Sequence, residues 1–330
     1  MENILTGLRA AAEPTRLRLL ALCAQGELTV TELTKILGQS QPRISRHLKL
    51  LCESGLLDRF REGTWVFYRI SENSENAKVG RALIRLLPAK DPNLLLDLQR
   101  LERVKEARAQ AAASYFRANA PRWDEIRSLH VPEEEVERVL LDLASTLKIE
   151  SLLDVGTGTG RMLEVFAPCV SRAVGIDRSH DMLAVARMNL ERAGLSHFQV
   201  RHGDMYQLPF PSGSFDAVVF HQVLHFADNP SAALLEAARV LRPGGVTVIV
   251  DFAPHDMEYL RKEHAHRRLG FSDDEVRQWF KGACLEMKET VRLPGQPLTV
   301  SVWSGILPVS LEEEISLHEV PRTSLREVTT

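Results

Sequence analysis

LLDVGTGTG, residues 152–160, is the stretch that decides the fold of the C-terminal part of this chain. Its first half is an apolar run typical of a buried strand, and glycine then stands at positions 156, 158 and 160. Glycine tolerates a positive φ and has no side chain to keep a ligand from the backbone. Arg161–Phe166 has helical spacing, so we expect the loop at a helix N-terminus. The alternative to a ligand-binding loop is an ordinary glycine turn. The dinucleotide-binding motif G-x-G-x-x-G fits poorly, because Arg161 stands in the place of its third glycine.

The segments after this loop have the spacing of further strand–helix–strand units. A second apolar run, Ala173–Asp177, ends in an acid about one such unit after Asp154. A carboxylate there can accept hydrogen bonds from both hydroxyls of a ribose. After a third short strand, Asp204 is placed to accept from an adenine amino group, with Met205 against the ring. The next predicted elements are a strand at 215–220, a helix at 231–241, a turn at 242–245 and a strand at 246–251.

Five strings occur in order along this region: D-V-G-T-G-T-G, G-I-D, G-D-M, F-D-A-V-V and L-R-P-G-G. Together they resemble the class I S-adenosylmethionine-dependent methyltransferases, and F-H-Q-V-L-H-F resembles the ubiquinone/menaquinone-biosynthesis type. The resemblance implies a Rossmann-like, doubly wound seven-stranded sheet that binds S-adenosylmethionine or S-adenosylhomocysteine. It implies a cofactor site formed by Asp154, Gly156, Thr157, Gly158, Gly160, Asp177, Arg178, Met182, Asp204, Met205 and His221.

A local excess of positive charge marks the first 72 residues. A helix is expected from about Gln41 to Ser54, with Ile44, Leu48 and Leu51 on its apolar face. The other face carries side chains that bind base edges and phosphates, namely Gln41, Arg43, Ser45, Arg46, His47 and Lys49. Two alternating strands, 57–61 and 64–70, predict a hairpin with Arg61 near its turn. The order helix–turn–helix–hairpin favours DNA binding over the alternative of a solvated amphipathic helix.

Two strings in this region, L-R-A-A-A-E-P-T-R-L-R-L-L and S-Q-P-R-I-S-R-H-L-K-L-L-C-E-S-G-L-L, resemble the ArsR/SmtB family of winged-helix repressors. The resemblance implies a homodimer on double-stranded operator DNA. Metal-sensing members often carry two cysteines in an E-L-C-V-C-D-L-like stretch. In this chain Thr29 and Thr31 stand in those places, so we expect no metal site of that type.

The middle of the chain is predicted to be helical at 77–87 and at 93–118. Apolar residues recur along the longer helix at three- and four-residue steps: Leu94, Leu98, Leu101, Val104, Ala107, Ala111 and Tyr115. Their partner is either the same helix in a second chain or a surface of the methyltransferase domain. Helical spacing also occurs at 8–24, with Pro14 near a helix start, at 32–37 (capped by Thr31) and at 256–268, and strands are predicted at 285–293 and 298–307. Residues 136–147 are expected to open the methyltransferase domain, and the segment 272–281 precedes the last two strands. The predicted domains are 1–72 (winged helix-turn-helix), 73–132 (helical linker), 133–310 (methyltransferase) and 311–330 (flexible tail).

Composition is that of an ordinary soluble globular protein, with 44% apolar and 26% charged residues and a mean hydropathy of −0.14. The expected fold class, α/β with several domains, follows from the motifs and not from composition. No apolar run reaches the length of a membrane span, and the N-terminus lacks the pattern of a signal peptide. The four cysteines lie far apart, which favours buried free thiols in a reducing cytoplasm. A net charge of −3 predicts that nucleic acid binds through a local patch only.

The sequence does not indicate which molecule would accept the methyl group. His221 and His225 are candidate general bases, four residues apart and on one face if their segment is helical, and structural histidines are an equal alternative. Neither the cysteine set of arsenic methylation nor the N-P-P-Y-like motif of amino methylation is present, and the histidines predict no metal site. Two hypotheses remain: a repressor that senses the cofactor, or an active small-molecule methyltransferase that also binds DNA. A DNA methyltransferase fits less well, because the motif for a flipped amino base is missing.

Overall fold

The computed structural model describes residues 1–62, 64–71, 74–120, 133–147, 149–195 and 197–309. The predicted tail at 311–330 and the end of the predicted linker lie outside these residues. Contacts group the chain into two compact units. The first unit contains Met1–Trp123, Leu224–Pro230 and Phe252–Phe271, and the second contains Asp124–Val223, Ser231–Asp251 and Ser272–Thr330. The predicted domain boundaries stay a prediction, and two segments of the predicted methyltransferase domain belong to the first unit by their contacts.

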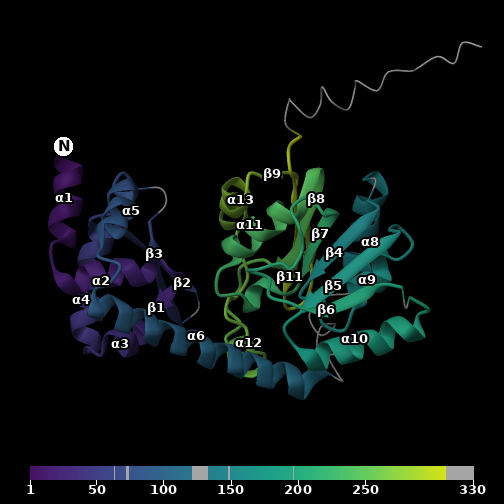
Figure 1. Ribbon diagram of the computed structural model, residues 1–330, viewed down its shortest axis with the longest axis horizontal. Coiled ribbons are helices and arrows are strands. Elements are labelled where there is room, and N and C mark those ends of the chain that lie inside the picture. The colour runs from purple at the N-terminus through teal and green to yellow at the C-terminus, as the bar shows by residue number, and fades with distance from the viewer. Residues whose placement is uncertain (63, 72–73, 121–132, 148, 196, 310–330) are drawn as a thin grey trace, which may run out of the picture. The chain divides into compact units, whose positions relative to one another are not determined.

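The N-terminal part of the first unit is a helical domain with a small sheet (Figure 1). Its elements are α1 (Glu2–Ala11), α2 (Pro14–Cys23), β1 (Leu28–Thr29), α3 (Val30–Leu37), α4 (Gln41–Glu53), β2 (Leu57–Glu62) and β3 (Trp65–Ile70). The sheet is antiparallel in the order β1-β3-β2. Ile44, Leu48 and Leu51 are fully buried with leucines of α2 and α3, so the predicted inner face of α4 is confirmed.

One prediction about a helix start in this domain is confirmed and one is wrong. The helical spacing over 8–24 belongs to two helices, and Pro14, predicted near a helix start, lies in the first turn of α2, where its missing N–H costs nothing. Thr29, and not Thr31, caps α3: its side chain accepts from the Glu32 amide while the Glu32 carboxylate accepts from the Thr29 amide at 2.9 Å. This reciprocal capping box satisfies two amides that the helix itself leaves unpaired.

The predicted middle helices are α5 (Ala77–Leu86) and α6 (Pro92–Asn119). The first half of α6 packs on α2 and α3, where Leu101 is buried and Asp97 accepts two hydrogen bonds from Arg18 at 2.6 and 2.7 Å. Farther along, the Tyr115 hydroxyl lies 2.8 Å from the imidazole Nδ1 of His264. The first half of α6 and the region of Tyr115 therefore both contact other residues of the first unit.

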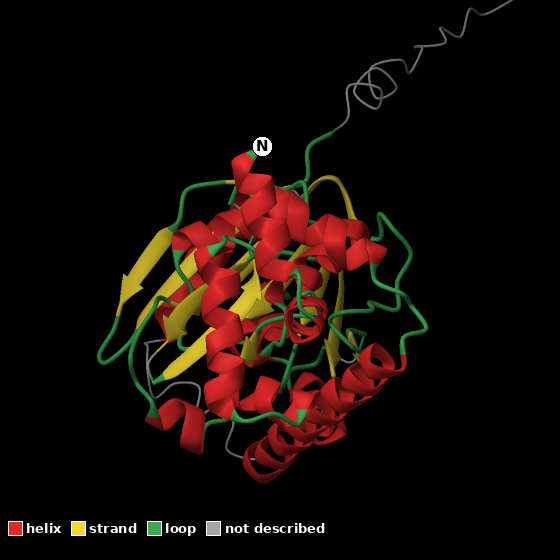
Figure 2. Ribbon diagram, turned by 90° about the vertical axis from the view of Figure 1, so that its left-hand side faces the viewer, coloured by secondary structure: helices red, strands yellow, loops and turns green. Residues whose placement is uncertain are grey.

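The second unit is built on a mostly parallel sheet, drawn as yellow arrows in Figure 2. Its strands are β4 (Ser151–Val155), β5 (Arg172–Asp177), β6 (Gln199–His202), β7 (Phe215–His221), β8 (Leu241–Phe252), β10 (Val291–Pro294) and β11 (Thr299–Ile306). They lie in the order β10-β11-β8-β7-β4-β5-β6, and short β9 (Glu286–Met287) pairs with β11. The predicted doubly wound seven-stranded sheet is confirmed, with β9 added. The strand order reverses at β4, which is where such sheets bind ligands.

Helices cover both faces of this sheet, with α8, α9 and α10 on one side and α11 and α13 on the other (Figure 1). Their bounds are α8 (Glu133–Thr146), α9 (Arg161–Phe166), α10 (His180–Arg192), α11 (Pro230–Val240) and α13 (Asp273–Gly282). Three local predictions are wrong. Strand β8 begins at Leu241 and runs through the predicted turn at 242–245, and the predicted strand at 285–293 is divided into β9 and β10. Of the helix predicted over 256–268, only α12 (Tyr259–Glu263) is helical. None of the described helices is long and apolar enough to cross a membrane.

Candidate functional site

The glycine loop after β4 has the backbone geometry that its sequence predicts. Gly156, Gly158 and Gly160 have φ of 75, 52 and 86°, a region that side-chain-bearing residues rarely adopt. The amides of Gly156 and Thr157 both donate to the Ile176 carbonyl, at 2.8 and 2.9 Å. The loop is thus tied to the end of β5, and α9 begins directly after it.

Close packing makes glycine obligatory at two positions around this loop. A Cβ on Gly156 would lie 2.3 Å from Cγ2 of Val223, which follows β7. A Cβ on Gly175, inside β5, would lie 2.5 Å from Oγ1 of Thr157. Since real Cβ atoms do not approach other atoms so closely, the path of the loop depends on these absent side chains as well as on the positive φ angles.

Asp177 is the acidic residue that links the loop to the end of β5. One carboxylate oxygen accepts from the Gly158 amide at 3.0 Å, and the other accepts from the Ser179 amide at 2.8 Å. Burial raises the pKa of Asp177, and hydrogen bonds from the backbone amides of Ser179, Gly158 and Arg178 offset this in part. Each oxygen has a further lone pair, so hydroxyl donors of a ligand would stabilise the charged form.

The predicted adenine side of the site lies at the end of β6. The Asp204 carboxylate accepts from the Tyr206 amide at 3.0 Å, and a guanidinium nitrogen of Arg178 lies 3.9 Å from it. His180 and His202 stack beside this edge with ring centroids 4.3 Å apart. We missed this pair in the sequence; the only signal was that each histidine lies just after a predicted strand. Met182, by contrast, has 1% of its surface exposed, so its side chain belongs to the core under α10.

The two candidate histidines have different surroundings. His221 ends β7 in the second unit and is partly exposed, whereas His225 belongs to the first unit and is 2% exposed. His225 lies on the 3-10 turn Leu224–Phe226 and stacks on His266, with centroids 4.0 Å apart. The condition for a shared helical face is not met, because β7 continues through His221. His225 is packed as a structural histidine would be.

The predicted DNA-binding face of α4 is largely accessible. Gln41, Arg43, Arg46 and Lys49 are exposed, Ser45 is partly exposed, and Arg61 is exposed at the end of β2. His47 differs, because only 15% of its side chain is exposed and its Nδ1 lies 3.7 Å from a carboxylate oxygen of Glu13. That contact directs His47 toward the start of α2, and the arginines and Lys49 form the accessible basic face.

The cysteines depart in part from the prediction of buried thiols. Cys23 is buried and Cys52 is half-buried, and burial raises the pKa of Cys52 to about 11. Cys169 and Cys284 are exposed, because each lies in a turn that follows a helix. All four are free thiols. Within the described residues, no three side chains of the His, Cys, Asp and Glu types gather as they would around a metal ion.

Comparison with known families identifies both parts of the chain. Residues 153–249 match the family model described as a methyltransferase domain, and residues 13–59 match the bacterial regulatory protein, arsR family. The chain joins an arsR-family helix-turn-helix domain to a class I methyltransferase domain. The second match covers α2, α3, α4 and the start of the β2–β3 hairpin, which we call the wing.

Relatives of the methyltransferase domain include enzymes of quinone biosynthesis. A demethylmenaquinone methyltransferase of Tropheryma whipplei is 39% identical over 104 residues, 32% of this chain and 42% of that protein. A ubiquinone biosynthesis O-methyltransferase of Dechloromonas aromatica is 28% identical over 65% of this chain and 96% of that protein. Several curated relatives, the T. whipplei enzyme among them, are matched over less than half of their own length. What these enzymes act on is therefore a matter of proposal for this chain.

The fold of the second unit also occurs in solved structures. The methyltransferase in a complex with the Haloferax volcanii Trm112 methyltransferase activator aligns with a TM-score of 0.50 and 20% identity, over 59% of this chain and 98% of that one. A likeness at this identity shows the fold alone.

A methyltransferase domain implies binding of S-adenosylmethionine or S-adenosylhomocysteine. The residues present fit that group: Gly156 and Gly158 have no side chains and are partly exposed, and the half-buried Asp177 presents carboxylate oxygens beside them. Asp204 offers a second acceptor where the adenine is predicted. The roles of the individual residues stay predictions.

Proposed function

We propose that this chain is an ArsR-type transcriptional repressor whose methyltransferase domain binds S-adenosylmethionine or S-adenosylhomocysteine as an effector. The proposal depends mainly on the exposed basic face of α4 within an arsR-family domain. Regulation is the simplest use of a DNA-binding domain joined to a cofactor-binding domain, whether or not methyl transfer persists. Binding to DNA through a homodimer is part of the proposal, supported by exposed apolar side chains on α1 and α6: Ile4, Leu5, Leu8, Leu95, Leu96 and Leu98.

The effector role is tested by titrating operator DNA with either compound at saturation and with neither. The two compounds differ by one methyl group and one positive charge, and a ligand shifts DNA binding only through its different affinity for two states of the protein. We expect operator affinities that differ by a coupling free energy of about 1–3 kcal/mol between the two ligands. Asp177→Ala serves as the control, since loss of a hydrogen bond to a charged group should weaken cofactor binding about ten- to hundredfold.

Equal operator affinity under all three conditions would contradict the effector role while leaving DNA binding intact. An unaltered cofactor affinity in folded Asp177→Ala, measured by calorimetry, would instead show that the ribose assignment is wrong.

The placement of the recognition helix is tested at Arg46, which is exposed on the outer face of α4. If Arg46 contacts a base, Arg46→Ala should weaken specific binding by about 1–3 kcal/mol. If it contacts phosphate only, all sequences should weaken together and the dependence on salt should become less steep. Arg81→Ala removes the same charge from an exposed position on α5 and serves as the control in binding assays at fixed salt. Equal operator binding by both variants would contradict the assignment of α4.

The second candidate function is methyl transfer to a small molecule. It is favoured by the complete glycine loop and by relatives that carry methyltransferase names. The bound sulfonium would supply the methyl group, and alignment with the acceptor would be the main catalytic contribution. A base is needed only if the acceptor loses a proton, and the partly exposed His221 is then a better candidate than buried His225. Turnover of radiolabelled cofactor with candidate acceptors separates this function from pure sensing.

A further inference from the structure

The wing has an aromatic face directed away from the core of its own domain. In the register of the hairpin, Phe60 pairs with Phe67 and Glu62 pairs with Trp65, so the three aromatic residues lie on one face. The rings of Phe60 and Phe67 stack with centroids 5.4 Å apart. The opposite face contributes Leu57, Tyr68 and Ile70 to the helix-turn-helix core. An arsR-type domain alone would leave the aromatic face in water, yet Phe67 is fully buried.

Three arginines from the covering segment, residues Phe252–Phe271, stack on this face, where Phe67 is buried, Phe60 is half-buried and Trp65 stays 39% exposed. The Cζ atom of Arg261 lies 4.6 Å from the Trp65 ring centroid, and that of Arg268 lies 5.1 Å from the Phe60 ring centroid. Arg267 approaches the Phe67 ring at 5.8 Å. The arginine side chains are between 3 and 9% exposed. Guanidinium groups stacked on aromatic rings are attracted by the ring quadrupole, more strongly where water is excluded.

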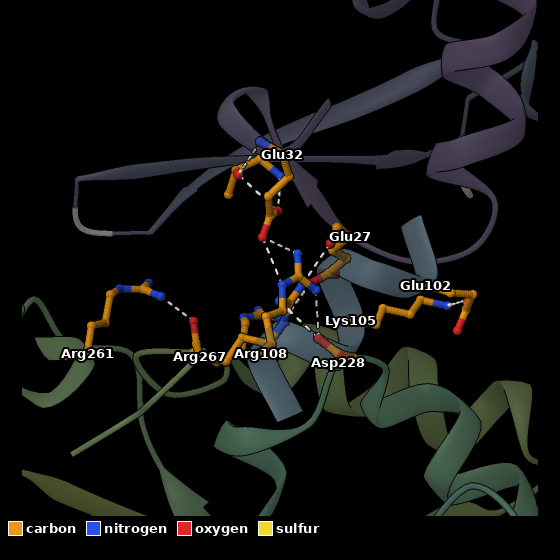
Figure 3. Close-up of polar contacts among 10 residues, drawn as sticks. Glu27, Glu32, Glu102, Lys105, Arg108, Asp228, Arg261 and Arg267 are labelled. Carbon is orange, nitrogen blue, oxygen red and sulfur yellow. Dashed lines mark hydrogen bonds and ion pairs between the residues drawn. The ribbon is translucent and has the colours of Figure 1, made fainter. Parts of the chain in front are cut away.

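Carboxylates neutralise the buried arginines, as Figure 3 shows for part of the set. Arg268 donates to the Glu27 carboxylate at 2.9 Å, and Arg267 donates to the Glu27 carbonyl at 2.8 Å and lies 3.0 Å from Asp228. Arg108 of α6 donates to Asp228 at 2.8 Å and also pairs with Glu32 of α3. The covering segment is therefore held by Glu27, just before β1, and through Asp228 by Arg108 in the middle of α6, as well as by the wing. Buried charges need such partners, because an unpaired one costs several kcal/mol.

At the wing turn the covering segment contributes an acid. The Glu258 carboxylate accepts a hydrogen bond from the Thr64 amide at 2.6 Å. Its other oxygen lies 3.8 Å from Nε of Arg261, the arginine that stacks on Trp65. Backbone amides at such turns are common donors to DNA phosphates. A carboxylate on the Thr64 amide thus occupies a donor that a phosphate would use, and it places negative charge where the DNA backbone would approach.

The covering segment also holds the turn that follows β7. The amides of Arg267 and Arg268 both donate to the His225 carbonyl, at 2.9 and 3.0 Å, and His266 stacks on the His225 ring. The covering segment itself continues from β8. In open α/β sheets, ligands bind beyond the carboxyl ends of the strands. The chain segments that follow β7 and β8 are therefore bound to each other, and the second of them covers the wing.

We propose that Glu258 acts as a phosphate mimic, so that the covering segment closed on the wing and DNA bound at the wing turn exclude each other. This inference depends on the DNA-binding part of the proposed function and adds an autoinhibitory contact to it. The apparent affinity for DNA is then the intrinsic affinity multiplied by the fraction of molecules in which the wing is open. Coupling between the methyltransferase domain and DNA then passes through the covering segment, which continues from β8.

The test compares Glu258→Gln with Glu263→Gln. Glu263 is the last residue of α12, which Glu258 precedes as N-cap, and it is exposed, so its replacement removes an equal charge without touching the wing. Without DNA, hydrogen exchange of residues 57–70 and 252–271 should become about two- to tenfold faster in Glu258→Gln, since a charged hydrogen-bond acceptor is replaced by a neutral one. At fixed salt, affinity for a duplex selected from a random-sequence pool should rise by a similar factor. Glu263→Gln should match the wild type in both measurements.

Unchanged exchange in Glu258→Gln would show that the contact does not hold the segment, and would overturn the proposal. Faster exchange with an affinity equal to that of Glu263→Gln would show a purely structural contact and would overturn it as well. If neither wild type nor Glu258→Gln enriches any duplex, the proposed repressor function fails, and competition with DNA is refuted with it even where exchange has changed. The exchange measurement thus separates failure of the contact from failure of the function.

Discussion

Gly156→Ala is expected to lower the free energy of unfolding by about 2–5 kcal/mol and to abolish measurable cofactor binding. A left-handed conformation costs a residue with a Cβ about 1–2 kcal/mol, and overpacking a dense site adds about 1–3 kcal/mol. Both apply here, because Gly156 has a φ of 75° and its added Cβ would lie 2.3 Å from Val223. Relief of the clash would move the loop that carries the Gly158 amide away from Asp177. Denaturant unfolding and calorimetry with S-adenosylhomocysteine measure the two effects.

Gly194→Ala is a matched control within the same unit. Gly194 has nearly the same φ, 74°, and nothing lies within 4 Å of its added Cβ, so only the conformational cost of about 1–2 kcal/mol should appear. Val223→Ala in the Gly156→Ala background should restore part of the stability by removing the nearest atom. Equal losses for Gly156→Ala and Gly194→Ala would contradict the close packing of the loop against Val223.

Arg18→Ala is expected to destabilise the first unit by about 3–5 kcal/mol, because it leaves the Asp97 carboxylate, 2% exposed, without its bidentate partner. The pair fastens α6 to α2, so the helix that continues toward Arg108 should also loosen. Lys105→Ala is the comparison on the same helix: Lys105 lies 3.0 Å from Glu102 in an exposed pair, whose removal should cost less than about 1 kcal/mol. Chemical denaturation of the three proteins gives the difference.

The double variant Arg18→Met/Asp97→Leu separates a buried charge from a lost contact. Apolar residues of similar size often replace a buried ion pair without loss. We expect the double variant to be far closer to wild type than Arg18→Ala is. A double variant as unstable as the single one would mean that α6 is held to α2 by the geometry of the ion pair itself.

Much of the cofactor fold follows from local sequence patterns. Apolar runs that end in Gly156 and in Asp177 predict parallel strands, because a strand buried on both faces needs continuous apolar residues. The glycines at alternate positions predict the positive φ angles, since other residues avoid them. The second helix of the helix-turn-helix could be predicted for a similar reason. Ile44, Leu48 and Leu51 repeat at the period of a helix, and this spacing does not depend on what they pack against.

Side chains whose role depends on distant parts of the chain could not be assigned in this way. The predicted helix at 256–268 has suitable local spacing, but burial of Arg261, Arg267 and Arg268 against the wing and Glu27 leaves only α12 helical. His225 was a candidate base, and packing against His266 makes it part of the interior.

The sequence by itself determined the two domain types, the order of their elements and the positions of the glycine loop and the basic helix, because each depends on residues close together in the chain. Only the tertiary structure decided that α6 uses Asp97 and Leu101 to pack on α2 and α3. It also decided that the aromatic face of the wing is covered by residues 252–271. The contacts of the wing with residues 252–271 join groups about two hundred residues apart in the sequence. No local period or spacing indicates which arginine will contact which ring.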